Sequence, residues 1–464
     1  MSKVKEKIKL ILKDKDQRNL YINILLAFVI KGVSLIISVF SMPLYMRYFS
    51  NESVLGVWYT ILSVLTWITV CDLGLGSGLR NRLTEAISNK DDTAKKEYIS
   101  STYILLTLII VPVSIIICVL FCFIDLNFVF KIETNLISVN NLRISIIILF
   151  LGVAINFVLK SVNSIIYAIQ KSSINNFLSL ITSVIPLVFI LLYNSSGNIE
   201  IDFITLSVVH VLAINLPLLI ATFFVFYEKQ LKGCFPSIKY YNKKIAKDSV
   251  AFGLQFFLAQ MFFMAIMSTN EFYITSLFSS ADVVEYSIYY KLFTVVGSLF
   301  MLALTPLWSK ITKDYCEGNY LKIKKTNRFL YIISAIALVI EFLMVPFLQF
   351  IVNIWLQEEA ILVSIPVALT FALFGSVYIF NVVLTTVANG IGELKSQIYF
   401  YGIGCVLKIG MCLLFKHIIS HWSIVVLANI IILTCFCIYQ IFWIEKRINL
   451  LIKSASCINK LNNL

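Results

Sequence analysis

Charged side chains interrupt the apolar runs of this chain at a few positions. Lys31, Lys160, Lys291 and Glu341 fall within such runs, and Glu271 lies toward one end of another. A charge near the middle of a membrane span costs about 2.5–3.5 kcal/mol on insertion scales, so it normally has a partner or lines a wet pathway inside the bundle. These residues therefore predict a polar route through a membrane protein.

Polar neighbours extend some of these charges into stripes along one helix face. Asn156, Lys160, Asn163 and Tyr167 recur at steps of three and four residues, and Asn381 begins a similar series in a later run. The simplest packing points such faces at each other across a central, water-accessible cavity.

Lysines in a cavity favour an anionic substrate, because phosphate oxygens form charge-assisted hydrogen bonds with ammonium groups. The acids Glu271 and Glu341, with Asp72 at the end of a span, are candidates for coupling to H⁺ or Na⁺, and no other cofactor is expected. Two simpler readings stay open. Lys160 and Lys291 lie near span ends and could extend to the headgroups, and either glutamate could neutralise a lysine in a buried pair.

The elements that position these residues are apolar runs of about 20 residues, each long enough to cross roughly 30 Å of hydrocarbon as a helix. The composition agrees, with 59% hydrophobic residues, 14% charged residues and a mean hydropathy of +0.89. Backbone groups in lipid must be satisfied within the segment, so the spans must be helical. We expect an all-α polytopic membrane protein with about 12 transmembrane helices, at residues 20–41, 54–75, 99–123, 143–166, 174–193, 201–226, 249–277, 285–308, 329–352, 361–388, 398–415 and 423–444.

Basic residues orient these spans. Thirty of the 38 Lys and Arg residues fall in the two tails and the loops on one side, and three fall in the loops on the other. Because cytoplasmic loops carry the excess of basic residues, both termini are predicted to be cytoplasmic. The net charge of +13 is then explained by loops that face anionic membrane lipids, and no nucleic-acid partner is expected.

The chain also reads as two related halves. A constant shift of 229 residues places Phe49 on Phe278 and Lys95 on Lys324, each at matching span ends. Six spans per half is an even number, so the halves share one orientation and are related by a pseudo-two-fold axis along the membrane normal. The predicted organisation is a basic cytoplasmic tail (1–19), an N-terminal six-helix lobe (20–227), a cytoplasmic linker (228–248), a C-terminal six-helix lobe (249–444) and a cytoplasmic C-terminal tail (445–464).

The most distinctive motif is CDLGLGSGLRNRL, residues 71–83, at the predicted cytoplasmic end of the second span. It joins Asp72 to three glycines and to Arg80 and Arg82. A dinucleotide fingerprint would need a preceding strand and a βαβ unit, and this motif follows a membrane helix. We interpret it as a flexible inner gate whose arginines meet substrate phosphate; anchoring of the arginines at the inner leaflet is the simpler alternative.

The topology and this motif together resemble the Wzx-type polysaccharide (O-antigen) flippases of the multidrug/oligosaccharidyl-lipid/polysaccharide (MOP) superfamily. The resemblance implies a MATE-like fold in the bacterial cytoplasmic membrane. It also implies flipping of an undecaprenyl-pyrophosphate-linked oligosaccharide to the outer leaflet by alternating access, without covalent chemistry. A polysaccharide polymerase and a chain-length regulator are then candidate partners, beside membrane lipids.

On these expectations, the candidate substrate-binding residues are Lys31, Lys160, Lys291, Arg80, Arg82, Asn156 and Asn381. The alternative of the same fold is a MATE-like antiporter of drugs or organic cations, which would need a cavity dominated by acids and aromatic residues. A membrane enzyme such as a polymerase would need a sizeable outer loop, and the longest one predicted, 124–142, carries few charges. No Walker motif is present either, so the protein is not expected to be an enzyme.

Overall fold

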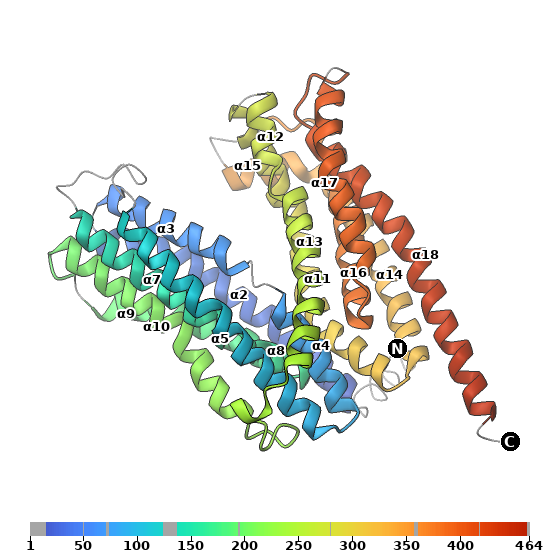
Figure 1. Ribbon diagram of the computed structural model, residues 1–464. Helices are drawn as coiled ribbons and strands as arrows, with labels where there is room; N and C mark the ends of the chain where they lie inside the picture. Colours follow the sequence, from blue (N-terminus) through green and yellow to red (C-terminus); the bar gives the residue numbers. More distant parts are fainter. Residues whose placement is uncertain are drawn as a thin grey trace, which may run out of the picture. The chain divides into compact units, whose positions relative to one another are not determined.

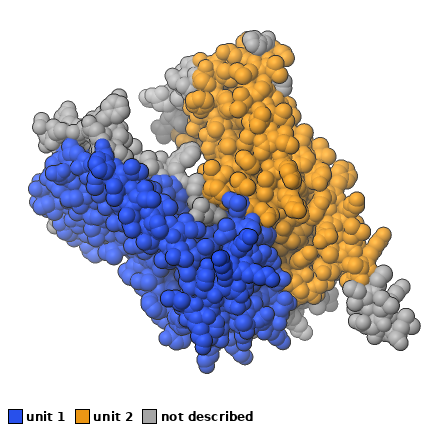
Figure 2. All heavy atoms as spheres, in the orientation of Figure 1, with its two compact units in different colours: residues 1–254 blue, residues 255–464 orange. Residues whose placement is uncertain are grey.

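A computed structural model of the protein describes residues 15–49, 51–70, 74–123, 137–193, 195–278, 280–356, 361–416 and 418–461. Within these ranges the secondary structure is helical, without strands. The chain divides into two compact units, residues 1–254 and 255–464 (Figure 2). The boundary between them falls inside helix α11 (Lys243–Met267).

Ten helical stretches of the described chain are long and apolar enough to cross a membrane, and they overlap the third to twelfth predicted spans. The first two predicted spans fall on α2 (Lys15–Phe49) and α3 (Glu52–Val70) (Figure 1). The prediction of an all-α, multi-pass membrane protein is therefore confirmed. The two-fold relation between the halves stays a prediction.

Unit 1 is built around α7 (Val139–Leu159), which packs against α10 (Ile199–Val225) and α5 (Asp92–Phe123). Helix α2 packs against α9 (Ser172–Leu192) in the same unit. A side chain at Gly152 of α7 would collide with α10, so the glycine permits this close approach.

Further elements of the described chain are α8 (Ser161–Ala168), η1 (Ile238–Tyr240), η2 (Val345–Phe347) and α15 (Leu348–Leu356).

The segment that was predicted to be a flexible gate is helical in its described part. Gly74 adopts a left-handed conformation (φ 66°), which glycine allows at little steric cost, and α4 (Leu75–Ser88) begins directly after it. Gly78 lies inside α4, where a Cβ would meet the backbone nitrogen of Gly253 at 3.4 Å. Gly74 and Gly78 thus serve a turn and a close helix contact in a segment that is helical from residue 75, and its role as an inner gate stays a prediction.

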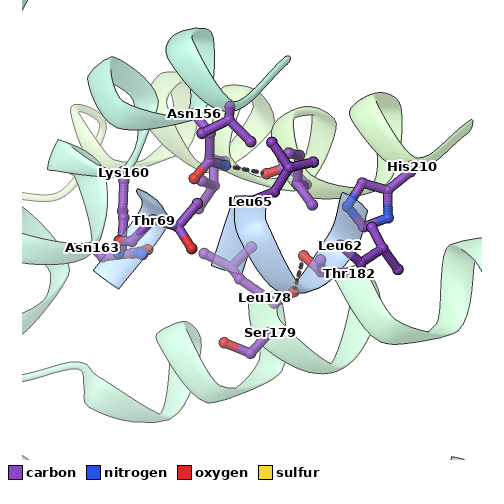
Figure 3. Close-up of a pocket in the computed structure, with 13 residues that line it drawn as sticks. Leu62, Leu65, Thr69, Asn156, Lys160, Asn163, Leu178, Ser179, Thr182 and His210 are labelled. Carbon is purple, nitrogen blue, oxygen red and sulfur yellow. Dashed lines mark hydrogen bonds between the residues drawn. The ribbon is translucent and has the colours of Figure 1, made fainter. Parts of the chain in front are cut away.

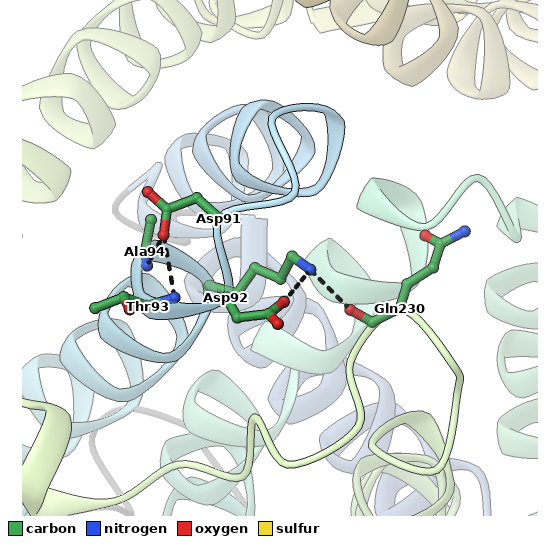
Figure 4. A network of polar contacts seen from close by, with 6 residues as sticks. Asp91, Asp92, Thr93, Ala94 and Gln230 are labelled. Atoms are coloured by element: carbon green, nitrogen blue, oxygen red, sulfur yellow. Dashed lines mark hydrogen bonds and ion pairs between the residues drawn. The ribbon is translucent and has the colours of Figure 1, made fainter.

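The predicted linker, residues 228–248, is fastened to the start of α5 (Figure 4). Asp91 accepts hydrogen bonds from two backbone N–H groups of the first turn, at 2.9 and 3.1 Å, as an N-terminal cap does. One turn on, the ammonium group of Lys95 contacts Asp92 Oδ1 at 2.7 Å and the backbone oxygen of Gln230 at 3.3 Å. The contact between Lys95 and Gln230 holds the predicted linker against α5 within unit 1.

Unit 2 is organised around α16 (Ile365–Ile391), which packs against α13 (Ser280–Cys316), α14 (Tyr320–Met344) and α18 (Ile424–Leu461). Helix α17 (Lys395–Lys416) packs against α18. More of α16 is buried than of any other candidate span, so its polar side chains face protein.

The seventh predicted span is broken near one end. Helix α11 ends at Met267, and α12 (Asn270–Leu277) begins after a turn at Ser268 and Thr269. Such a break leaves the last carbonyls of α11 without partners in their own helix. Those groups need donors from elsewhere in the unit.

Candidate functional site: two polar cavities in unit 1

The larger polar cavity of unit 1 has a volume of about 380 Å³ and is lined by residues of α3, α7, α8, α9 and α10 (Figure 3). Figure 3 shows Lys160 and Asn163 near one end and His210 near the other. Asn156 lies between them and donates a hydrogen bond to the backbone oxygen of Ile214 at 2.8 Å. Its amide is therefore held in place by α10.

The smaller polar cavity, of about 200 Å³, is lined by residues of α4, α5, α7 and α8. Arg80 of α4 contributes to its wall and is only 4% exposed. Its guanidinium carbon lies 4.4 Å from the centre of the Tyr167 ring, within the range of a cation–π contact. Burial lowers the pKa of Arg80 to about 9, so the side chain still carries its positive charge at neutral pH.

Lys160 and Asn163 line both cavities. Lys160 is the single residue between α7 and α8, and it keeps a right-handed helical conformation. Its ammonium group donates to the backbone oxygen of Thr69, at 3.2 Å, in the last turn of α3. A cation at the end of a helix is favourable because the last carbonyls lack partners there. Lys160 is thereby positioned where the two cavities share a wall.

The polar stripe predicted from the sequence is found in these walls. Asn156 lines the larger cavity, Tyr167 lines the smaller one, and Lys160 and Asn163 line both. The four side chains thus line two neighbouring cavities, and their contact with a substrate stays a prediction.

The other predicted residues of unit 1 are placed differently. Arg82 points away from the cavities: it forms ion pairs with Asp248 at 2.9 Å and Glu85 at 3.3 Å. Lys31 lies on α2, but its side chain is outside the described residues, as is the whole of Asp72. Unit 1 thus brings together Arg80, Lys160 and Asn156 but not Arg82.

The candidates in unit 2 differ in exposure. Asn381 of α16 is buried and donates to the hydroxyl oxygen of Tyr401 at 2.8 Å. Lys291 on α13 and Glu271 on α12 are exposed within the unit.

Glu341 of α14 is fully buried in unit 2, and neither carboxyl oxygen has a hydrogen-bond partner among the described residues. It faces α16 at Gly375, where a Cβ would lie 2.8–2.9 Å from the carboxyl atoms. The alternative in which Glu341 neutralises a lysine in a buried pair is not found in the described part of the chain. A buried acid of this kind is unusual, since polar groups inside a membrane protein are normally paired.

Lys408 of α17 was not predicted as a site residue, although it also lies in an apolar run. It is 1% exposed and donates to the backbone oxygen of Ile266, to Thr269 Oγ1 at 3.1 Å and to Asn270 Oδ1 at 2.7 Å. Asn429 donates to the same Asn270 oxygen at 2.8 Å. Lys408 thus donates hydrogen bonds to acceptors at the end of α11 and in the turn that follows it. The Ser-Thr-Asn sequence at 268–270 is typical of a turn and could have suggested this break in the helix.

These arrangements favour binding of an anion in unit 1. Arg80 and Lys160 line one cavity, and both guanidinium and ammonium groups form charge-assisted hydrogen bonds with phosphate oxygens. Among the described residues, no group of three or more His, Cys, Asp and Glu side chains could hold a metal ion.

Comparison with known proteins begins from sequence. No family model matches the chain. A protein of Yersinia pseudotuberculosis that is assigned by name to O-antigen export is 24% identical over 376 residues, which cover 78% of this chain and 81% of that protein.

In fold, the chain is similar to a MATE transporter crystallised in the bent conformation, with a TM-score of 0.75 at 14% identity. It is also similar to an outward-facing multidrug resistance MATE transporter of the MOP superfamily, with a TM-score of 0.71 at 16% identity. Each match covers 96% of this chain and 98% of the known structure. The chain is thus similar in sequence to a protein named for O-antigen export, and it has a MATE-like fold.

Proposed function

We propose that the protein flips an undecaprenyl-pyrophosphate-linked oligosaccharide from the inner to the outer leaflet of the bacterial cytoplasmic membrane, for O-antigen or another surface polysaccharide. The observation that carries the proposal is the pair of cations, Arg80 and Lys160, on the walls of one interior cavity of unit 1. A pyrophosphate offers several oxygens to such donors. The name of the Yersinia relative supports a lipid-linked oligosaccharide as the substrate.

The larger cavity has the chemistry to contact sugars next to the pyrophosphate. Its lining includes the amides of Asn156 and Asn163 and the hydroxyls of Ser179 and Thr182. Such groups both donate and accept hydrogen bonds, as sugar hydroxyls do. Because Lys160 lines both cavities, one ligand could place its phosphates beside Lys160 and extend its sugars toward His210.

The transport would proceed by alternating access and needs no covalent chemistry, so we do not propose an enzyme. Glu341 is the candidate for H⁺ or Na⁺ coupling, because it is a buried acid without a hydrogen-bond partner in the described chain. The distribution of basic residues supports cytoplasmic termini. A polymerase and a chain-length regulator are proposed partners for the later use of the flipped lipid.

The test is a flipping assay with the purified protein in proteoliposomes. The probe is an undecaprenyl-pyrophosphate-linked oligosaccharide with a fluorophore on its terminal sugar that dithionite quenches in one leaflet. We expect Lys160→Ala and Arg80→Ala each to lower the flipping rate by about 10- to 100-fold, the equivalent of one charge-assisted hydrogen bond. Lys160→Arg should keep most of the activity because it keeps the charge.

Lys171→Ala is the matched control, since this lysine pairs with Glu228 and lines neither cavity. It should flip the probe at the wild-type rate. Flipping that is equally fast in all variants would contradict the site assignment. Failure of the wild-type protein to flip the probe, together with a drug-resistance phenotype, would replace the proposal with a MATE-like multidrug antiporter.

A further inference from the structure

An apolar groove of about 640 Å³ runs along unit 1 between α5 and α7. Its wall on α5 extends from Thr107 to Val119, and its wall on α7 extends from Ile147 to Leu159. The two helices are antiparallel neighbours, so each wall covers 12 residue steps, or about 18 Å. The groove therefore follows more than half of the roughly 30 Å hydrocarbon thickness.

The lining of the groove is apolar and includes small side chains. Pro112 lies inside α5 near the groove residues Val111 and Ser114, and it cannot donate a backbone hydrogen bond. Ser114 of α5 and Ala154 of α7 are the small side chains that line the groove. Thr107 also lines it, but its hydroxyl donates to the backbone oxygen of Tyr103 in its own helix, at 2.8 Å. The groove therefore offers an apolar surface to a hydrocarbon chain.

The end of the groove adjoins the smaller polar cavity. On α5, Thr107 lines the groove and its neighbour Leu106 lines the polar cavity. On α7, Leu159 lines the groove and the next residue, Lys160, lines the polar cavity. On each helix, the lining of the apolar groove and the lining of the cationic cavity thus meet at neighbouring residues.

We propose that this groove holds the first isoprene units of the polyprenyl tail while Arg80 and Lys160 bind the pyrophosphate. The inference rests on the proposed function and assigns a site to the lipid part of that substrate. A groove within a bilayer gains little from the hydrophobic effect, because lipid tails are as apolar as its walls. Selection must come from dispersion contacts that depend on shape, which differ between a methyl-branched polyprenyl chain and a straight acyl chain.

The experiment compares the labelling of the full-length protein in nanodiscs by two photoreactive lipids. One is undecaprenyl pyrophosphate with a diazirine near the phosphate end of its tail, and the other is phosphatidylglycerol with a diazirine in an acyl chain. We expect the polyprenyl probe to label α5 and α7 peptides and excess undecaprenyl pyrophosphate to suppress this labelling. Ile155→Trp should lower the labelling by about tenfold because it fills the groove.

Ile144→Trp is the matched control on the same helix. Ile144 is 47% exposed and lies outside the groove, whereas Ile155 is 53% exposed and lines it, so neither change requires repacking of a buried core. The control should be labelled like the wild type.

Equal labelling by both probes would overturn the proposal, because the groove would then hold bulk lipid. Labels mapped elsewhere, with flipping intact in the wild type, would overturn the groove and leave the proposed function standing. Absence of both flipping and polyprenyl labelling in the wild-type protein would overturn the proposed function as well. A protein crosslinked to the groove in place of lipid would also overturn the proposal.

Discussion

Replacing Gly375 with alanine tests whether Glu341 is packed against α16 in the way the structure shows. A Cβ at this position would lie 2.8 Å from the carboxyl carbon of Glu341 and 2.9 Å from both of its oxygens. Glu341 is fully buried, so the carboxyl group has little free space to move away. The added methyl group must therefore displace the acid or bend the contact between α14 and α16.

The expected change in the free energy of unfolding is the difference between two opposing effects of Gly375→Ala. Overpacking a buried site typically costs about 1–3 kcal/mol. Replacing a helical glycine by alanine returns about 0.5–1 kcal/mol, because alanine has less backbone freedom to lose. Gly375→Ala should thus lower the free energy of unfolding by about 0–2.5 kcal/mol. Gly410→Ala on α17, where nothing lies within 4 Å, should raise it by about 0.5–1 kcal/mol.

The assay is unfolding of the purified protein in mixed micelles with increasing SDS, followed by circular dichroism. The double variant Glu341→Ala/Gly375→Ala supplies the decisive comparison, because removal of the carboxyl group removes the clash. In that background Gly375→Ala should be neutral or stabilising, which corresponds to a coupling free energy of about 1–3 kcal/mol. If Gly375→Ala alone stabilises the protein as much as Gly410→Ala does, the position of Glu341 is refuted.

Two further predictions concern other charged residues. Lys408→Met should lower the free energy of unfolding by about 1–3 kcal/mol, because the carbonyl of Ile266 loses its cationic donor. The control is Lys416→Met, on the exposed end of the same helix, which should leave the free energy of unfolding nearly unchanged. Equal effects of the two substitutions would argue against the role of Lys408 at the helix break. The exposed pair of Arg82 and Asp248 should show a coupling of no more than about 1 kcal/mol in a double-mutant cycle, decreasing with added salt, and a larger salt-independent value would mean that the pair is buried.

The sequence predicted the candidate site best where polar residues recur at helical spacing along one segment. The series Asn156, Lys160, Asn163 and Tyr167 could be read from its spacing alone, since side chains three and four residues apart share a helix face. The same reasoning predicted the helical spans, because each apolar run carries its own signal. The break at Lys160 between α7 and α8 was not visible, because no glycine or proline marks it.

Contacts between distant segments could not be read in this way. Lys408 finds its partners about 140 residues away in sequence, at Ile266 and Asn270. Gly78 was interpreted as a source of flexibility, but it provides space for Gly253, a role that depends on how α4 packs against α11. A single glycine has the same local signature in both cases, so only the tertiary structure separates them.

The two units carry different chemistry, which bears on how transport could be coupled. In unit 1 the cations Arg80 and Lys160 line a cavity, where the phosphates of the proposed substrate would add charge-assisted hydrogen bonds. In unit 2 the acid Glu341 is buried without a described partner, so a proton or a sodium ion would stabilise it. A ligand shifts a conformational equilibrium only by its difference in affinity for the two states. Substrate and ion would therefore act on separate units, and the coupling between them must arise from a conformation in which the Glu341 carboxyl group gains water or a hydrogen-bond partner that the described residues do not provide here.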